Sequence, residues 1–378
     1  MRKVTLGFLV CLALPCAAQA SAYSDFNAGL AARNEHDADG AIRFLSQALA
    51  APDLPAHLRS TAYFSRAQAY GTNKQIDLAI ADLTSSLALA PDDFDVLTAR
   101  ASLYQEKKLF DLARADFTAA IAVRPELIDG YYGHAGVNMA ERKYDDAIKD
   151  YDAALAALPG DIDLLLLRGD AAREAGRYDA AVKDFSDAIS ANSRYGEAYL
   201  LRGRAYLESG DPKSAVSDYE DAIDLNPDDA GLREIAGIAQ WEYGNYRDAA
   251  RNFSKAAADS GRAAFSYLWL YLADAKRDAI DAELAQDAAK ADLRKWPGPL
   301  LGLFIGTGSV ADVEAAAKQG DAGEQSDHAC TVAFFVGEWH LMRKEQAEAR
   351  TLLVKAAACR PGLPESHAAR AEIARLGP

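Results

Sequence analysis

The chain has 378 residues and a formal net charge of −15 at neutral pH, and half of its residues are hydrophobic, which is enough to build a core. Nucleic acid and anionic membrane surfaces attract basic patches, so an acidic balance of this size argues against both as partners. Beyond the N-terminal region, no stretch of sequence is long and apolar enough for a membrane span, which needs about 20 residues.

The N-terminal segment has the features of a signal peptide. Arg2 and Lys3 precede an apolar stretch over residues 4–14, and two overlapping A-x-A motifs end at Ala20 and Ala22. A charged start, a short apolar segment and small residues at a cleavage site are typical of a secretory leader. We therefore expect residues 1–20 to be removed, with cleavage after Ala20 or Ala22, and the protein to be periplasmic or secreted.

Cys16 raises the alternative of a lipid anchor. The residues before it, Leu14 and Pro15, make a poor lipobox. We therefore do not expect lipidation. Removal of the leader leaves 39 basic and 56 acidic residues, a net charge of −17, and it leaves Cys330 and Cys359 as the only cysteines.

Alanine recurs at one constant spacing through the middle of the chain. The column contains Ala79, Ala113, Ala147, Ala181, Ala215 and Ala249, and an earlier copy over residues 22–55 places Ala41 in it. The residue twelve positions before this alanine is small, the residue four positions after it is large, and the residue seven positions after it is small. Proline ends most of the repeats. A period of roughly 34 residues predicts stacked helix–turn–helix repeats, seven of them over residues 22–263.

This small–large–small–proline pattern resembles the tetratricopeptide repeat (TPR) family. The resemblance implies an all-α fold in which pairs of antiparallel helices stack into a right-handed superhelical solenoid. The physical argument agrees, because one pair of helices cannot bury its apolar face without neighbours.

Two polar columns accompany the alanines. An aspartate lies three positions after the alanine, and an arginine, replaced once by His134, lies thirteen positions before it. Each aspartate is thus followed by the basic residue of the next repeat, as Asp82 is by Arg100. We predict ion pairs between repeats, and the alternative is a set of solvated charges that contribute about 0–1 kcal/mol each.

The repeat period fails after residue 263. Residues 264–329 are expected to form a divergent helical segment, residues 330–363 a final TPR-like repeat, and residues 364–378 a capping helix and tail. Within the divergent segment we expect an apolar helix over 267–273, a polar helix to about Arg294, a break at Trp296, a short helix over 309–319 and a polar loop over 320–327.

The C-terminal part resembles the C-terminal half of the bacterial lipoprotein NlpI group. The resemblance rests on the 267–273 helix, the Trp296-Pro-Gly-Pro turn, the 335–340 segment and the closing 368–372 helix. It implies a cell-envelope TPR adaptor that binds peptidoglycan hydrolases and a periplasmic processing protease, and that forms a homodimer.

The final repeat carries a candidate disulfide. Cys330 is expected near the start of its first helix and Cys359 at the end of its second, and antiparallel helices bring those two ends together. Two thiols in an oxidising compartment favour a bond. The alternative is a pair of buried thiols that pack as small hydrophobic groups.

The TPR resemblance also assigns a partner-binding groove to the first helix of each repeat. Its residues are Asp95, Glu106, Asp129, Tyr132, Asp163, Asp170, Arg173, Glu174, Glu197, Arg204, Glu208 and Trp241. This lining is acidic with apolar patches, so it favours basic or neutral extended peptide segments. The alternative is that these acids are ordinary solvated residues and the interface lies elsewhere.

No catalytic motif is present, and the histidines near the cysteines lack metal-ligand spacing, so we expect no catalytic residue, cofactor or metal. Residues 306–311 partly imitate a dinucleotide-binding loop, but a turn before a helix explains them better. The sequence therefore predicts a non-catalytic periplasmic adaptor or scaffold that binds protein partners. Two alternatives stay open: a small-molecule or glycan-binding protein that uses the apolar C-terminal region, and an enzyme with an unrecognised site.

Overall fold

The computed structural model describes residues 14–258, 263–280, 285–286, 288, 291–360 and 362–377. Within these ranges all regular secondary structure is helical. Most of the predicted leader lies outside the described residues, and residues 14–20 form the start of the first helix. The chain divides into an N-terminal unit, residues 1–159, and a C-terminal unit, residues 160–378.

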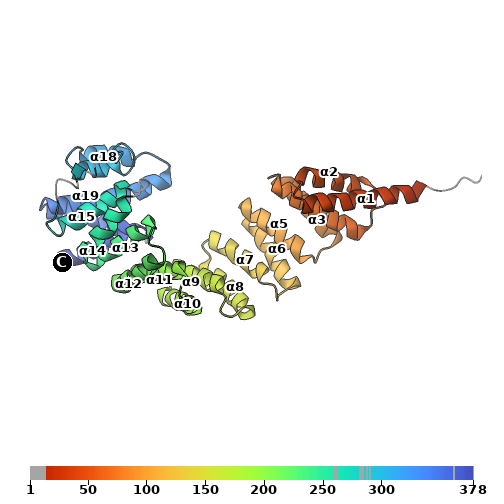
Figure 1. Cartoon of the computed structure of the whole chain (residues 1–378), viewed down its shortest axis with the longest axis horizontal. Coiled ribbons are helices and arrows are strands. Elements are labelled where there is room, and N and C mark those ends of the chain that lie inside the picture. The colour runs from red at the N-terminus through yellow and green to blue at the C-terminus, as the bar shows by residue number, and fades with distance from the viewer. Residues whose placement is uncertain are drawn as a thin grey trace, which may run out of the picture. The chain divides into compact units, whose positions relative to one another are not determined.

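The N-terminal unit consists of four helical hairpins that pack in sequence order (Figure 1). Its helices are α1 (Leu14–Asn34), α2 (Ala38–Ala50), α3 (Ala56–Thr72), α4 (Ile76–Leu89), α5 (Phe94–Glu106), α6 (Phe110–Val123), α7 (Ile128–Ala140) and α8 (Tyr144–Ala157).

The C-terminal unit begins with three more hairpins and continues into helices of unequal length (Figure 1). The hairpin helices are α9 (Ile162–Glu174), α10 (Tyr178–Ala191), α11 (Gly196–Ser209), α12 (Pro212–Leu225), α13 (Ala230–Tyr243) and α14 (Tyr246–Ala257). They are followed by α15 (Ala263–Ala275), α17 (Gly298–Phe304), α18 (Val310–Ala317), α19 (Ala322–Met342), α20 (Gln346–Ala357) and α21 (Pro364–Leu376).

The columns of small and large residues form a contact inside each hairpin. Gly203 lies on α11 and Tyr219 on α12, and a Cβ atom on Gly203 would lie 2.7 Å from Cε1 of the Tyr219 ring. Tyr219 and the preceding alanine of the column, Ala215, are fully buried. The small residue is therefore needed because the aromatic ring of the second helix packs directly on the backbone of the first.

The turn inside each hairpin recurs with the same period as the alanine column. Each of these turns contains one residue with a positive φ. In chain order these residues are Lys74, Lys108, Arg142, Gly176, Gly210 and Gly244. Glycine adopts this left-handed conformation without a steric cost, which explains its use in the last three turns.

The prediction of ion pairs between repeats is wrong. Each aspartate of the column pairs with the preceding basic residue, in its own hairpin, and the arginine pairs are Arg66–Asp82, Arg100–Asp116, Arg168–Asp184 and Arg202–Asp218. In the last pair two parallel hydrogen bonds of 2.8 and 2.7 Å join the guanidinium to the carboxylate. The third nitrogen of Arg202 reaches Ser186 of the preceding repeat at 2.9 Å, so the neighbouring repeats are linked through a hydroxyl group.

We expect Asp218→Ala to lower the free energy of unfolding by about 2 kcal/mol, because the mostly buried Arg202 would lose the one carboxylate partner that it has among the described residues. Denaturant unfolding followed by tryptophan fluorescence measures this loss. Asp187→Ala is the matched control, since it breaks the exposed Lys183–Asp187 pair and should cost less than about 0.5 kcal/mol. Equal losses in the two variants would favour the interpretation of the columns as solvated charges.

The divergent segment differs from the sequence prediction at one main point. Residues 320–327 are not a loop, because α19 begins at Ala322 and runs on for 21 residues. Asp321 and Glu324 form a capping box there, which starts the helix earlier than the apolar pattern indicated. The short helix α18 also begins with a capping box, between Ser309 and Asp312, and residues 306–308 form the turn that precedes it. The predicted polar helix up to Arg294 is wrong at its start and at its end, because α15 ends at Ala275 and residues 276–280 and 291–294 are turns or irregular structure. Residues 281–284, 287, 289 and 290 of this prediction lie outside the described residues.

An aromatic cluster joins the last repeats to this segment. Trp269 of α15 stacks on Phe253 with 5.8 Å between ring centroids, and it also contacts Trp241, Phe334 and Phe335. All five side chains are buried. Helices α13, α14, α15 and α19 therefore share one continuous core.

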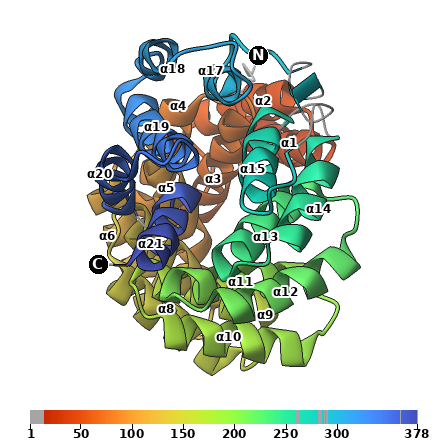
Figure 2. The same cartoon turned by 90° about the vertical axis from the view of Figure 1, so that its left-hand side faces the viewer.

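Helix α21 covers part of this unit. It packs against α20, α19 and α13 (Figure 2). Its Arg375 donates hydrogen bonds to the backbone carbonyl oxygens of Trp241, at 3.0 Å, and Glu242. The last helix thus returns to a hairpin that lies far before it in the sequence.

Candidate functional site

The N-terminal unit contains a cavity of about 600 Å³ lined mainly by the first helices of three successive hairpins. Helix α3 supplies Phe64 and Gln68, α5 supplies Phe94, Asp95, Thr98, Ala99, Ser102 and Gln105, α6 supplies Phe117, and α7 supplies Asp129, Tyr132 and Gly133. We call this the α3–α5–α7 groove. Its aromatic rings and polar groups lie side by side, which is the composition expected of a peptide-binding surface.

Two carboxylates and one exposed ring give the groove its chemical character. Asp95 and Asp129 are exposed, and neither has a cationic partner among the described residues. The Tyr132 side chain is 54% exposed, although aromatic rings are usually covered in a folded protein. A lysine or arginine side chain could contact the face of this ring and pair with a neighbouring carboxylate.

Gly133 allows this part of the groove to form. A Cβ atom at this position would lie 2.2 Å from Cε1 of Phe117. Phe117 is buried, with 2% of its surface exposed, and it fixes the separation of α6 and α7. The backbone of α7 can therefore sit close to the ring of α6 only because position 133 has no side chain.

Most of the predicted groove residues of the N-terminal unit come together here. Asp95, Asp129 and Tyr132 line the cavity, whereas Glu106 is exposed but lies outside the lining. Phe64 and Gln68 also line the cavity, although they are not among the groove residues predicted from the sequence. The repeat period could have identified them, since they occupy the same positions of their repeat as Thr98 and Ser102 do in the next one.

The predicted groove residues of the C-terminal unit fall into two groups. Asp163, Glu174, Glu197 and Arg204 are exposed. Arg173 is only 7% exposed, because it donates hydrogen bonds of 2.8 Å to both Asp170 and Glu208. Burial disfavours its charge, but Asp170 and Glu208 outweigh that effect and raise the pKa of Arg173. Arg173, Asp170 and Glu208 therefore form an internal ion network instead of an open binding surface.

Trp241 was predicted to line the groove, and this is wrong. Its side chain is fully buried against Trp269 and Phe334, and the Arg375 guanidinium lies 5.0 Å from its ring centroid. The cause is α21, which occupies the position where a ligand would contact this tryptophan.

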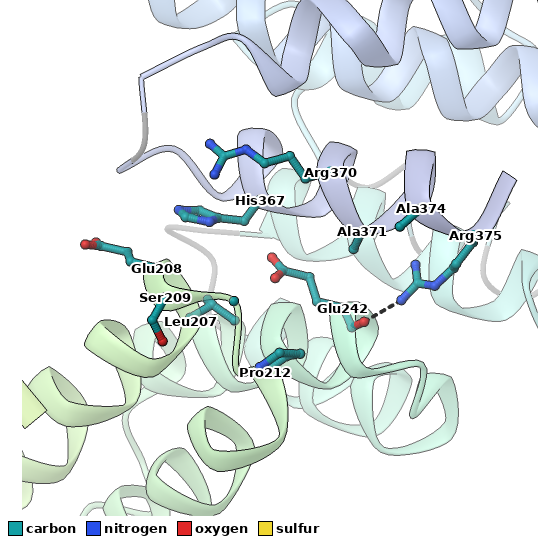
Figure 3. A pocket seen from close by; sticks show the side chains of 11 residues that line it. Leu207, Glu208, Ser209, Pro212, Glu242, His367, Arg370, Ala371, Ala374 and Arg375 are labelled. Carbon is teal, nitrogen blue, oxygen red and sulfur yellow. Dashed lines mark hydrogen bonds between the residues drawn. The ribbon is translucent and has the colours of Figure 1, made fainter. Parts of the chain in front are cut away.

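Two smaller cavities remain between the first helices of the C-terminal unit and the C-terminal segment. One, of about 300 Å³, is lined mainly by residues of α11 and α13, such as Leu200, Arg204 and Ile238, by Tyr219 of α12, and by Gly362, Pro364 and His367. The other, of about 500 Å³, lies between the end of α11, Glu242 of α13 and helix α21 (Figure 3). Both include Leu207, Glu208 and His367, so they adjoin one another.

A disulfide joins Cys330 of α19 to Cys359, just after α20, the pair that the sequence predicts. The Cα atoms of the two residues are 6.1 Å apart, within the usual range for such a bond. It therefore links the two helices of the last hairpin.

In the part of the chain that the structure describes, no cluster of three or more His, Cys, Asp or Glu side chains is suited to a metal ion. None of the helices in that part has the length and hydropathy needed to span a bilayer.

Stacked helical hairpins with a cavity across their first helices define an α-helical repeat protein, a class that uses such surfaces for binding. Residues 60–93, 97–162 and 166–230 match models of the tetratricopeptide repeat. Over these residues the chain consists of tetratricopeptide repeats, and proteins built from such repeats are generally non-catalytic scaffolds that bind proteins or peptides. No curated protein matches the sequence.

Solved structures of other TPR proteins resemble parts of this chain. The C-terminal part of a TPR repeat-containing protein from Cytophaga hutchinsonii is 17% identical, with a TM-score of 0.52 over 69% of this chain and 98% of that one. A TPR protein from Parabacteroides merdae is 21% identical, with a TM-score of 0.48 over 67% and 99% of the two chains. YrrB, described as a TPR protein with an unusual peptide-binding site, is 20% identical, with a TM-score of 0.39 over 55% and 97%. The first of these likenesses supports the fold of the stacked hairpins.

Proposed function

We propose that the protein is a non-catalytic, exported scaffold that binds an extended basic segment of a partner protein in the α3–α5–α7 groove. The observation that carries this proposal is the exposed Tyr132 ring in one cavity of about 600 Å³ with two carboxylates, Asp95 and Asp129, that have no cationic partner in the part of the chain that the structure describes.

The charges of the groove select the partner. An acidic segment would meet two uncompensated carboxylates, whereas a lysine or arginine would gain an ion pair and a contact with an aromatic ring. The polar groups of Thr98, Ser102 and Gln105 lie along α5 in the same cavity, where they can bond to the backbone of an extended peptide. The groove therefore favours a short peptide with one or two basic residues.

Export is part of this proposal. The signal-peptide features of residues 1–20 support it, and so does the disulfide between Cys330 and Cys359, because such bonds persist in oxidising compartments. The resemblance of the C-terminal region to the NlpI group suggests partners among envelope proteases and peptidoglycan hydrolases, and it suggests a homodimer.

We expect the double variant Asp95→Lys, Asp129→Lys to bind a fluorescently labelled short peptide containing two lysines at least tenfold more weakly than the unchanged protein. Fluorescence anisotropy at low ionic strength measures the affinity, which should also fall with added salt. Tyr132→Ala should weaken binding by about tenfold, because the cation loses the ring.

The chain offers a closely matched control. Asp111 and Asp145 are also exposed, also lie one repeat apart, and also occupy the second position of their helices, α6 and α8. The variant Asp111→Lys, Asp145→Lys therefore has the same change in charge and a similar effect at helix N-termini. Equal affinity of the two double variants, or tighter binding of a glutamate-containing peptide, would contradict the groove as the binding site.

A further inference from the structure

The cavity of about 500 Å³ in the C-terminal unit contains a carboxyl group that has no hydrogen-bond partner among the described residues (Figure 3). Glu242 near the end of α13 is only 9% exposed, and its Oε1 atom is buried without a hydrogen-bond partner. Because Glu242 lines the cavity while Oε1 is enclosed, Oε2 is the oxygen that the cavity can reach. Figure 3 shows the carboxyl group directed at α21, between His367 and Ala371.

The protonation of Glu242 determines what the cavity can offer. Burial raises the pKa of its carboxyl group to about 8, although Arg375 and Arg370 act in the opposite direction. At neutral pH the group therefore holds its proton and can donate a hydrogen bond through an O–H. The Glu242 side chain has no hydrogen-bond partner among the described residues, so an acceptor that reaches Oε2 from the cavity would receive this hydrogen bond without displacing another group.

The charged and titratable groups that line the cavity with Glu242 come from two helices: Arg370, Arg375 and His367 from α21, and Glu208 from α11. On α21, Arg375 is already engaged with the Glu372 carboxylate, at 2.9 Å, and with the backbone of α13. Arg370 is bonded only to the Ser366 hydroxyl group and, more weakly, to the Ala357 carbonyl group, and it has no carboxylate partner among the described residues. On α11, the Glu208 carboxylate is neutralised by Arg173.

The remaining lining of the cavity is small and partly apolar. It includes Leu207 and Pro212 on one side and Ala371 and Ala374 on the other. Among the described residues, the cavity thus offers a neutral carboxyl O–H without a hydrogen-bond partner and a guanidinium without a carboxylate partner, beside a narrow apolar wall. Both of these groups donate hydrogen bonds, so the complementary ligand is an acceptor with a negative charge.

We propose that this cavity is a binding site for a carboxylate group, which would accept hydrogen bonds from the Glu242 carboxyl group and from the Arg370 guanidinium. The carboxylate belongs to a small organic acid or to the C-terminus of a peptide, and its short apolar chain lies against Leu207 and Ala374. This site is separate from the α3–α5–α7 groove, and it requires α21 because that helix supplies one of the two donors.

The test compares three probes of similar size on the full chain: butyrate, butyramide and butylammonium. We expect butyrate to bind with a Kd on the order of millimolar, as so small a ligand allows, and the other two probes to bind at least tenfold more weakly. Chemical shifts of the Leu207 and Ala374 methyl groups, measured by NMR during titration, place the probe. Preferential binding of butylammonium or butyramide would overturn the carboxylate assignment, and no shift with any probe would overturn the site.

Variants separate the two donors from the fold. Arg370→Gln should weaken butyrate binding by at least tenfold. Glu242→Leu removes the carboxyl group and should abolish binding, whereas Glu242→Gln keeps a neutral donor and should retain it. Thermal unfolding of each variant shows whether the unit is intact, and retention by Glu242→Gln keeps the test valid even where Glu242→Leu is poorly folded.

The pH dependence gives a second readout. Binding to the protonated carboxyl group should be constant below pH 7 and about thirtyfold weaker at pH 9.5, because the proton is lost through a pKa of about 8. In Glu242→Gln this decline should be absent. A decline of the same size in Glu242→Gln would contradict the role of Glu242.

A final arm distinguishes the two sources of the carboxylate. The tetrapeptide acetyl-Gly-Ala-Ala-Leu is tested with a free C-terminus and as its amide. Tighter binding of the free acid than of butyrate identifies a peptide C-terminus as the ligand class. Tighter binding of butyrate identifies a small free acid, and equal binding of the acid and the amide contradicts recognition of the carboxylate.

Discussion

The stability of the C-terminal unit is expected to fall as the pH rises from about 4.5 to about 8. The pKa of Glu242 is raised to about 8 by burial, and burial also raises the pKa of the fully buried Glu338. Above about pH 4.5 the unfolded chain has released both protons, whereas the folded chain retains the Glu338 proton up to a pKa of about 7 and the Glu242 proton up to a pKa of about 8. Unfolding therefore releases protons, and a rise in pH favours the unfolded state.

The magnitude follows from the size of the pKa shift. Each pH unit in the window costs about 1.4 kcal/mol per retained proton, so Glu242 alone accounts for a loss on the order of 5 kcal/mol in the free energy of unfolding between pH 4.5 and pH 8. Glu242→Gln removes the titrating group, and it should flatten the curve and stabilise the unit at pH 8.

Tryptophan fluorescence reports specifically on this unit, because all four tryptophans of the chain (Trp241, Trp269, Trp296 and Trp339) lie in it. Urea unfolding between pH 5 and pH 9 gives the pH dependence. The control is Glu197→Gln on the exposed start of α11, which should leave the slope unchanged. If Glu242→Gln at pH 8 is no more stable than the unchanged protein, the carboxyl group is not held in its neutral form.

Loss of the Cys330–Cys359 disulfide is expected to lower the free energy of unfolding by about 3.5 kcal/mol. The two residues are separated by 29 positions, and closing a loop of that length removes this much conformational freedom from the unfolded chain in the entropic treatment. The double variant Cys330→Ser, Cys359→Ser, followed by the same fluorescence signal, measures the loss.

Reduction of the unchanged protein with dithiothreitol should give the same result as the double variant. Dithiothreitol should have no effect on the variant itself, which controls for effects of the reagent elsewhere. In a repeat protein each hairpin contacts only its neighbours, so the loss should concern the last hairpins and leave the α3–α5–α7 groove intact. Unchanged peptide binding by the double variant checks this, and a loss of binding would contradict it.

The sequence by itself determined the repeats and the place of Asp95, Asp129 and Tyr132 in the groove. A hairpin that repeats at a constant period requires a small residue wherever the aromatic ring of its partner helix packs, so Gly203 and Tyr219 could be read as columns. The same period placed Asp95 and Asp129 at equivalent positions of successive first helices, which explains why both line one cavity. These inferences succeeded because a solenoid is built from contacts between residues that are close in sequence.

Only the tertiary structure decided which partner each charged residue has and which part of the surface is covered. A column aspartate such as Asp82 could pair with Arg66 of its own hairpin or with Arg100 of the next, and the packing of the hairpin selected the first. The contact of Arg375 with Trp241 spans 134 positions, and neither residue belongs to a pattern that refers to the other. Such a contact depends on how α21 packs against α13, and no local periodicity encodes that long-range arrangement. For this reason Trp241 is a core residue and Glu242 lines a cavity beside α21.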